Sequence, residues 1–321
     1  MSAAPRAGSA RDPLLIGTRA SALARRQTEI VIQALHRIDP SIVCRVELIR
    51  TQGDEATDIA FSQFESQGVF VRRIEEALLG YEIDLAVHSY KDMPSISTAD
   101  LTIAAFLSRE DPRDALVTRT GLKLSELPGG ASVGTGSPRR QAQLGTVRQD
   151  LQIAGIRGNV DTRVRRVAEG NVDAIVLAAA GLSRLGRLAE ASELLDPSIF
   201  VPAAGQGIIA VQTRSDNALV RDLLARLDDS DTRACAIAER AVAISINAGC
   251  QTPLGAYAEI VEGQMRLSAF LAARDGSMRR ASAEGEPSQG PELGAEVGRK
   301  LARRKGRNSQ PDTVKATDAR R

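Results

Sequence analysis

Several kinds of residue and pattern are scarce or missing in this 321-residue chain. Tryptophan is absent and aromatic residues make up only 3%, which leaves few side chains to stack on the bases of single-stranded nucleic acid. No apolar run reaches the ~18 residues that a membrane span needs, and the opening "MSAAPRAGSARDP" lacks the apolar core of a secretion signal. We therefore expect no nucleic-acid partner, no membrane partner, and a short disordered lead-in.

Charge of one sign and paired cysteines are also missing. Lys and Arg total 42 against 40 Asp and Glu, a formal net charge of +2, so no global field favours a polyanionic surface. Three cysteines without a CxxC pair predict reduced thiols, a cytoplasmic location and no metal site of the structural zinc type. We expect Cys44 and Cys235 in the core, whereas Cys250 lies in the turn-forming stretch "INAGCQTPLG" and is the candidate functional thiol.

The patterns that are present indicate an α/β protein. Short apolar runs such as "PLLIGT" alternate with amphipathic stretches such as "SALARRQTEIVIQALHRI" as far as about residue 225, which predicts parallel sheets. The helical stretch "RACAIAERAVAISI", the cysteine loop and two strand-like runs, "GAYAEIV" and "QMRLSAFLAA", then predict a smaller α+β unit. From Gly285 onward glycine, proline and charge dominate, so we expect a frayed helix and a disordered basic tail.

Arginines recur in the turns that follow three of the predicted strands. In open α/β sheets ligands bind outside the carboxyl ends of the strands. A cation at a helix N-terminus costs ~0.3–1 kcal/mol unless an anion lies between it and the helix dipole. No P-loop or GxGxxG pattern is present, so carboxylates and phosphates both remain possible ligands. The pattern predicts a polyanion pocket built from Arg19, Arg139, Arg140, Arg157 and Arg163.

The segment "IDLAVHSYKDMP" adds the candidate chemistry. A buried strand ending at His88 would place Ser89, Lys91 and Asp92 at its mouth. A simple Lys–Asp pair in a polar loop is one interpretation. A carboxylate beside several cations in a cleft is also a natural candidate for acid–base work.

Together these segments resemble one family. "GTRASALARRQ", "REDPRDALV", "GTGSPRRQAQL", "IRGNVDTR", "PAAGQGI" and "AGCQTPLGAYAEI" occur in order between about residues 14 and 275 and are similar to the porphobilinogen deaminase (hydroxymethylbilane synthase) family. The resemblance implies two periplasmic-binding-protein-like lobes with a central cleft, plus a small α+β C-terminal domain. The implied limits are 1–107 with 206–225, 108–205, and 226–321.

The resemblance also implies an activity in tetrapyrrole (heme) biosynthesis. A monomeric transferase would join four porphobilinogen units head to tail, with release of ammonia, into hydroxymethylbilane. Growth would start on a dipyrromethane cofactor held by a thioether to Cys250. A non-catalytic two-lobed anion receptor is the alternative, which would account for the arginines but not for Cys250 together with Asp92.

The residues of the family's motifs carry over to positions of this chain. The implied catalytic residues are Asp92 and Lys91. The implied cofactor-binding residues are Cys250, Arg139, Arg140, Ser89, Lys91, Asp92, Thr135, Ser137 and Arg163. The implied substrate-binding residues are Arg19, Gln27, Arg157, Arg163 and Arg184. This chain departs from the family's pattern at Gln63, Glu65, Gln67, Ser245 and Ala248, which weakens the positive charge expected around the cleft.

Overall fold

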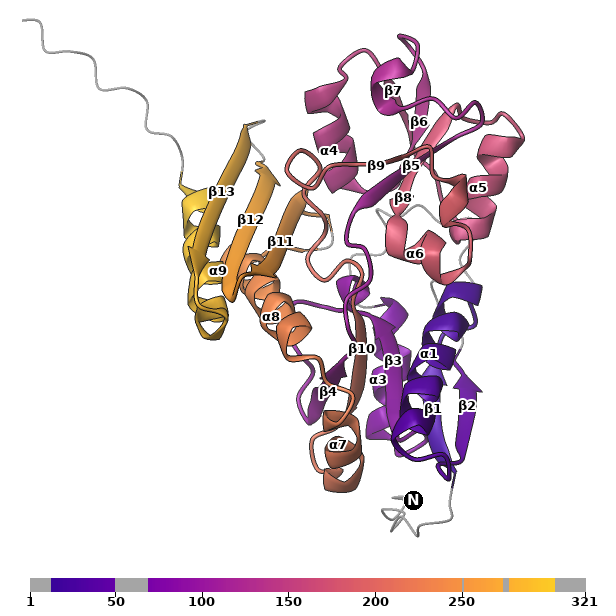
Figure 1. The fold of residues 1–321 in the computed structure, drawn as a ribbon, viewed down its shortest axis with the longest axis vertical. Helices are drawn as coiled ribbons and strands as arrows, with labels where there is room; N and C mark the ends of the chain where they lie inside the picture. The colour runs from indigo at the N-terminus through magenta and orange to yellow at the C-terminus, as the bar shows by residue number, and fades with distance from the viewer. Residues whose placement is uncertain (1–12, 50–68, 250, 274–276, 304–321) are drawn as a thin grey trace, which may run out of the picture.

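The computed structural model describes residues 13–49, 69–249, 251–273 and 277–303. These residues form two sheet-and-helix lobes, one above the other in Figure 1, with a third and smaller unit beside them. The predicted fold class, two α/β lobes and a small α+β unit, is confirmed.

The first lobe is built on a five-stranded sheet with the order β2-β1-β3-β10-β4. β1, β2 and β3 are parallel, while β10 runs antiparallel to both of its neighbours. The elements of this lobe are β1 (Leu14–Thr18), α1 (Ala22–Ile38), β2 (Cys44–Leu48), α3 (Val69–Leu79), β3 (Leu85–Ser89), the 3-10 turn η2 (Tyr90–Asp92), β4 (Leu101–Phe106), β10 (Ile209–Arg214) and α7 (Ala218–Ala225).

The second lobe repeats this plan with the order β7-β6-β8-β5-β9. Again three strands are parallel, and the strand in the fourth position, β5, is antiparallel to its neighbours. Its elements are β5 (Asp114–Thr118), η3 (Leu124–Glu126), β6 (Ser132–Gly134), α4 (Pro138–Val147), β7 (Gln152–Ala154), α5 (Val160–Ala168), β8 (Ala174–Ala178), α6 (Ala179–Arg184), η4 (Leu188–Glu190) and β9 (Glu193–Leu194).

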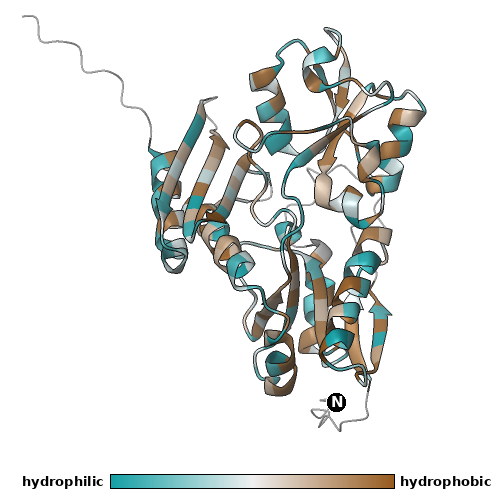
Figure 2. Ribbon diagram, in the orientation of Figure 1, coloured by the Kyte–Doolittle hydropathy of each residue, from teal (hydrophilic) through white to brown (hydrophobic). Residues whose placement is uncertain are grey.

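In both sheets the fourth strand is reached by a crossing between the lobes. The chain leaves β4 of the first lobe and enters β5 of the second through residues 107–113, and returns to β10 through residues 195–208. β5 and β10 are buried along their whole length, and Figure 2 shows the central strands of both lobes in hydrophobic colours. Buried strands covered on both faces explain the continuous apolar runs of the sequence.

Local sequence signals fix where the site-forming helices begin. The Ser21 side chain caps α1 by accepting a hydrogen bond from the backbone of Ala24, and Ser137 caps α4 in the same way for Arg140. Pro138 occupies the first turn of α4, as predicted, because its fixed φ suits that position. Each cap therefore aims a helix N-terminus at the turn that precedes it.

The third unit contains a three-stranded antiparallel sheet, β11-β12-β13, and two helices that pack on each other. Its elements are α8 (Ser230–Ser245), β11 (Leu254–Val261), β12 (Gln264–Ala272), β13 (Met278–Gly285), η5 (Pro287–Gln289) and α9 (Gly290–Ala302).

The expectation of a frayed helix after Gly285 was wrong for α9, because Leu293, Val297 and Leu301 form a buried stripe against the sheet and α8. The tail from residue 304 lies outside the described residues. β13 was missed because its side chains alternate between exposed and half-buried, without the apolar alternation that marks a strand.

Two other expectations met different outcomes. Cys235 is buried, as predicted. Cys44 is only half-buried, because β2 is the edge strand of its sheet. The domain limits stay a prediction.

Candidate active site

The centre of the candidate site is the short turn that follows β3. The strand is buried up to His88, and the chain then turns through η2, which Met93 closes by donating its backbone N–H to the Tyr90 carbonyl at 3.1 Å. Lys91 is half-buried and Asp92 is exposed. The predicted placement at the mouth of a strand puts this carboxylate at the carboxyl end of a nearly parallel sheet, where ligands bind.

The turns after β1 and β3 enclose a cavity of about 70 Å³ on one side of Asp92. Gln27 of α1 is 2% exposed and shares two hydrogen bonds with the Ser89 hydroxyl, at 2.9 and 3.0 Å. That pair fixes both side chains at the cavity wall. Among the predicted site residues, the cavity brings together Arg19, Gln27, Ser89 and Asp92.

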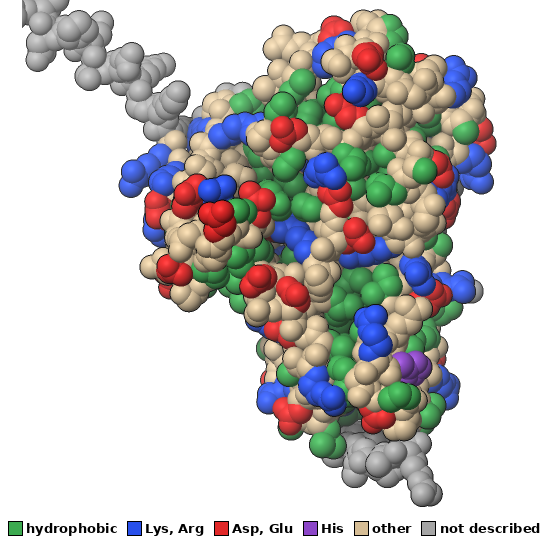
Figure 3. Space-filling model, in the orientation of Figure 1, with side chains coloured by type: hydrophobic (Ala, Val, Ile, Leu, Met, Phe, Trp, Pro, Cys, Tyr) green, Lys and Arg blue, Asp and Glu red, His purple; other side chains and the backbone are tan. Residues whose placement is uncertain are grey.

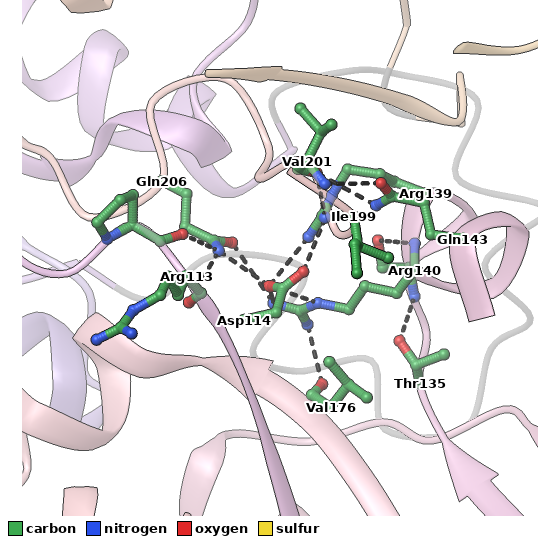
Figure 4. Close-up of polar contacts among 12 residues, drawn as sticks. Arg113, Asp114, Thr135, Arg139, Arg140, Gln143, Val176, Ile199, Val201 and Gln206 are labelled. Atoms are coloured by element: carbon green, nitrogen blue, oxygen red, sulfur yellow. Dashed lines mark hydrogen bonds and ion pairs between the residues drawn. The ribbon is translucent and has the colours of Figure 1, made fainter. Parts of the chain in front are cut away.

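A buried carboxylate from the second lobe organises the two arginines of α4. Figure 4 shows Arg139 and Arg140 converging on Asp114, the first residue of β5. Arg139 Nη1 lies 2.8 Å from Asp114 Oδ2, and Arg140 Nη2 donates to Oδ1 at 2.8 Å. Backbone carbonyls also accept from these guanidinium groups: Val201 from Arg139 Nη1, and Val176 from Arg140 Nη1. The guanidinium groups are therefore fixed charges rather than mobile side chains.

The electrostatics of this cluster leave it positive. Burial alone would raise the pKa of Asp114, but attraction by Arg139 and Arg140, together with their hydrogen bonds, holds that pKa well below its usual value. One carboxylate thus stays ionised against two guanidinium groups. Arg139 Nε is buried, and no described residue accepts a hydrogen bond from it.

Gln206 connects this cluster to the η2 turn and to both crossings. Its amide nitrogen donates to the Pro112 carbonyl at 2.7 Å and to Asp114 at 2.9 Å, so the two crossing segments are bonded to each other. Its amide oxygen accepts from Lys91 Nζ at 3.4 Å. Figure 4 shows Gln206 on the opposite side of Asp114 from the two arginines.

Lys91 and Arg163 complete the positive surroundings of Asp92. Burial lowers the pKa of Lys91 to about 8, with Asp92 acting in the opposite direction and Arg140 in the same direction. Burial and Arg140 also lower the pKa of Arg163, against the attraction of Asp92. Asp92 therefore interacts electrostatically with a cation from each lobe, Lys91 and Arg163. Thr135 and Ser137 lie in the turn before α4, where the Ser137 N–H donates to the Thr135 hydroxyl at 3.2 Å.

Three predicted residues lie elsewhere. Arg157 is exposed in the loop between β7 and α5. Arg184 donates to the Gly207 carbonyl at 2.6 Å and lines a separate cavity of about 460 Å³, whose wall contains both apolar and charged residues. Figure 3 shows hydrophobic and basic side chains next to each other where the two lobes meet. Burial lowers the pKa of Arg184 to about 10, and Glu110 opposes that shift. Cys250 lies outside the described residues, as do Gln63, Glu65 and Gln67.

Sequence reasoning missed the buried partners that hold the site together. They are Asp114, Gln206 and the ion pair between Arg109 and Glu239, whose Nη1 and Oε1 lie 2.6 Å apart. The one available signal was a charged residue inside an apolar run, as in "DALVT" for Asp114. Among the described residues no group of three or more His, Cys, Asp or Glu side chains could hold a metal ion. None of the helices in the described part of the chain is both long and apolar enough to cross a membrane.

Comparison with known proteins gives consistent matches over most of the chain. Residues 14–222 match the family model "Porphobilinogen deaminase, dipyromethane cofactor binding domain", and residues 233–303 match "Porphobilinogen deaminase, C-terminal domain". The match to the first model confirms the predicted dipyrromethane cofactor.

Similar relatives and solved structures complete the comparison. A porphobilinogen deaminase of Roseiflexus sp. is 47% identical over 92% of this chain and 97% of its own, and one of Syntrophobacter fumaroxidans is 45% identical over 89% and 93%. Among solved structures, the Bordetella pertussis BvgS periplasmic VFT2 domain is 16% identical, with a TM-score of 0.40 over 67% of this chain and 86% of its own.

Proposed function

The chain belongs to the porphobilinogen deaminase family, and on that premise we propose that it joins four porphobilinogen units head to tail into hydroxymethylbilane. In each round the C–N bond of a substrate aminomethyl group breaks and the nitrogen leaves as ammonia. A C–C bond forms at that methylene carbon, and the attacked pyrrole carbon loses a proton. One water molecule, consumed when the finished product is released, supplies its terminal hydroxyl group. The observation that carries the proposal is one carboxylate, Asp92, at the cavity after β1 and β3, where Lys91 of the first lobe and Arg163 of the second interact with it electrostatically.

We assign Asp92 and Lys91 as the catalytic residues. When ammonia leaves, positive charge remains on the substrate's pyrrole ring, and a fixed carboxylate beside it stabilises that charge. The same carboxylate can accept hydrogen bonds from pyrrole N–H groups. Lys91, whose pKa lies near 8, still carries a proton at neutral pH and can hold substrate carboxylates. Asp92 lines the cavity described above, so its carboxylate is accessible to a ligand that enters there.

The residues around Asp92 fit a dipyrromethane, which carries several carboxylates. Arg139 has a buried Nε without a described acceptor, and the Asp114 cluster keeps a net positive charge. When bound, the cofactor supplies the pyrrole carbon at which the product grows. The proposed cofactor-binding residues are Cys250 for the thioether, and Arg139, Arg140, Ser89, Lys91, Asp92, Thr135, Ser137 and Arg163 for polar contacts. The proposed substrate-binding residues are Arg19, Gln27, Arg157, Arg163 and Arg184.

We further propose a monomer that works in the cytoplasm, with domains at 1–107 with 206–225, 108–205 and 226–321. The cleft residues named above come from a single chain, so the proposed chemistry needs no second copy. Reduced cysteines are consistent with this location.

Asp92→Asn tests the proposal, because it removes the charge while preserving the shape of the side chain. We expect intact-protein mass spectrometry to find the dipyrromethane increment on wild-type protein, and a loss of turnover of about 100-fold or more in Asp92→Asn, with substrate binding largely retained. Cys250→Ser should lack the mass increment.

Two outcomes would count against this function. A variant Asp92→Asn that turns over within a few-fold of wild type would make Asp92 a structural residue of the turn. Wild-type protein at the bare sequence mass, after incubation with porphobilinogen, would favour the non-catalytic receptor.

A further inference from the structure

Helix α8 of the third unit contacts the first lobe through Arg240. Its guanidinium group donates hydrogen bonds to backbone carbonyls at both ends of the η2 turn, which carries Asp92 and is called the catalytic turn below. Its Nη1 donates to the carbonyls of Met93 at 2.7 Å and Pro94 at 2.8 Å, and its Nη2 donates to the Tyr90 carbonyl at 2.9 Å. These three carbonyls flank Lys91 and Asp92 on both sides. One planar guanidinium therefore fixes both ends of the segment that carries the carboxylate.

An aromatic contact reinforces the same link. The Arg240 Cζ lies 4.1 Å from the centroid of the Tyr90 ring, and the Tyr90 ring meets Phe106 edge to face with centroids 4.8 Å apart. Phe106 in turn lies under Arg233, two turns earlier on α8, at 4.9 Å. Through these ring contacts α8 packs on the catalytic turn at Tyr90 and on β4 at Phe106.

The opposite side of the turn is closed by the second crossing. Gly205 has a φ of +76°, and a Cβ at this position would lie 2.5 Å from Tyr90 Cδ1 and 3.2 Å from the Lys91 nitrogen. The Gly205 N–H donates at 2.6 Å to Glu239, the residue before Arg240. The same helix therefore defines both walls between which the turn lies.

The turn needs these contacts because it has few hydrogen bonds within itself. η2 is three residues long, and the bond from the Met93 N–H to the Tyr90 carbonyl is its closing hydrogen bond. Isolated turns of this length are weak. A shift of about 1 Å in a catalytic group can reduce a rate by 10²-fold.

We propose that Arg240 is a positioning residue, through which the third unit sets the place of Asp92. The proposal rests on the proposed role of Asp92. Position 250, the cofactor attachment point, follows the end of α8 along the chain. α8 thus connects the segment that carries Asp92 to the stretch of chain that leads to the proposed attachment point.

Arg233 offers a matched control for Arg240. It also docks α8 on the first lobe through backbone carbonyls, at 3.1 Å to Ala104, and through a cation–π contact, but it does not touch η2. We expect Arg240→Gln to lower kcat by about 10- to 100-fold with little change in KM, while Arg233→Gln keeps kcat. Amide exchange in the peptide 89–95, read by mass spectrometry, should accelerate in Arg240→Gln only.

Two further variants separate an effect on the catalytic turn from a general loss of folding. Arg240→Lys keeps a charged donor and should recover part of kcat. Gly205→Ala should displace the turn from the other side and reproduce the loss of kcat without altering α8. The proposal is overturned if Arg240→Gln keeps kcat and exchange at 89–95, or if Arg233→Gln loses as much kcat at an equal loss of Tm. Wild-type protein that forms no hydroxymethylbilane would instead contradict the proposed function, and the exchange experiment would still decide whether Arg240 holds the turn.

Discussion

His88 lies near the end of β3, just before the η2 turn, yet its surroundings keep it out of acid–base chemistry at neutral pH. Its Nε2 lies 3.0 Å from the Gln212 amide oxygen, and Gln212 donates to Glu75 at 2.9 Å. Thr98 completes the network by donating to Glu75 at 2.7 Å. Burial lowers the pKa of His88 to about 4, against the hydrogen bond to Gln212. The imidazole therefore stays neutral at neutral pH.

The same shift predicts how stability depends on pH. Between the folded pKa of about 4 and the ordinary value of 6.5, the unfolded chain binds more protons at this histidine than the folded chain. The contribution of His88 is therefore fully present above pH 6.5 and is lost as pH falls towards 4, by about 3 kcal/mol in all. Urea unfolding at pH 4.5 and 7 should show a smaller difference for His88→Gln than for wild type.

The chain's other histidine supplies the control. His36 is exposed on α1, and the comparison is between His36→Gln and His88→Gln under identical conditions. If both variants reduced the pH dependence of the free energy of unfolding equally, the buried His88 would not be the cause of that dependence.

At the scale of elements, α8 and α9 meet along a seam of small residues. Gly290, Gly294 and Gly298 recur every fourth residue on α9 and face α8. A Cβ on Gly294 would collide with the Ala238 carbonyl and lie 2.6 Å from the Ala241 Cβ. This close approach keeps α8, and with it Arg240, in a fixed position against the sheet of the third unit.

Gly294→Ala should therefore destabilise the protein, although alanine normally favours helices. We expect a loss of about 1–3 kcal/mol from overpacking against the backbone of α8. Gly145→Ala is the matched change, because this helical glycine of α4 has no heavy atom within 4 Å of an added Cβ, and it should stabilise by about 0.5–1 kcal/mol. Thermal unfolding of both variants checks the signs, and a neutral Gly294→Ala would mean that the two helices can separate at low cost.

Sequence reasoning located elements whose signal is local and missed those whose signal is not. The strand–turn–helix starts at Ser21 and Ser137 were predictable, because capping residues and apolar runs act within a few positions. β13 was not, because an edge strand rich in charge has no apolar face to reveal it.

The same distinction holds in the candidate site. Asp92 and the arginines were identifiable from their place after strands. The partners Asp114 and Glu239 act across 25 and 130 residues, on Arg139 and Arg109 respectively, and no local pattern encodes those distances.

At the scale of the whole molecule, the Asp114 cluster joins the lobes at their crossings. Gln206 from the return crossing contacts Pro112 and Asp114 at the end of the outward crossing. Arg139 and Arg140 anchor α4 to the same carboxylate. The relative placement of the lobes thus depends on one buried charge.

Asp114→Asn should be strongly destabilising, because it removes the one negative charge that the buried Arg139 and Arg140 guanidinium groups share. Breaking a buried pair in this way costs about 3–5 kcal/mol. Sulfate should raise the Tm of this variant more than that of wild type, since an anion can replace the lost charge. Asp150→Asn, at an exposed ion pair with Arg148, should change the Tm little. Similar Tm values for Asp114→Asn and Asp150→Asn would show that the cluster does not hold the lobes.

The position of β10 also determines the order in which the molecule can be completed during synthesis. This strand lies between β3 and β4 in the first sheet, yet it comes after every strand of the second. A nascent chain that has emerged as far as residue 205 contains a finished second lobe and an open first sheet, whose β3 and β4 have no common neighbour. The sheet in the middle of the chain can therefore be completed before the sheet that contains the first strands, contrary to the usual N-terminal-first order. Until Ile209–Arg214 leaves the ribosome, β3 and the η2 turn that follows it lack the neighbouring strand β10.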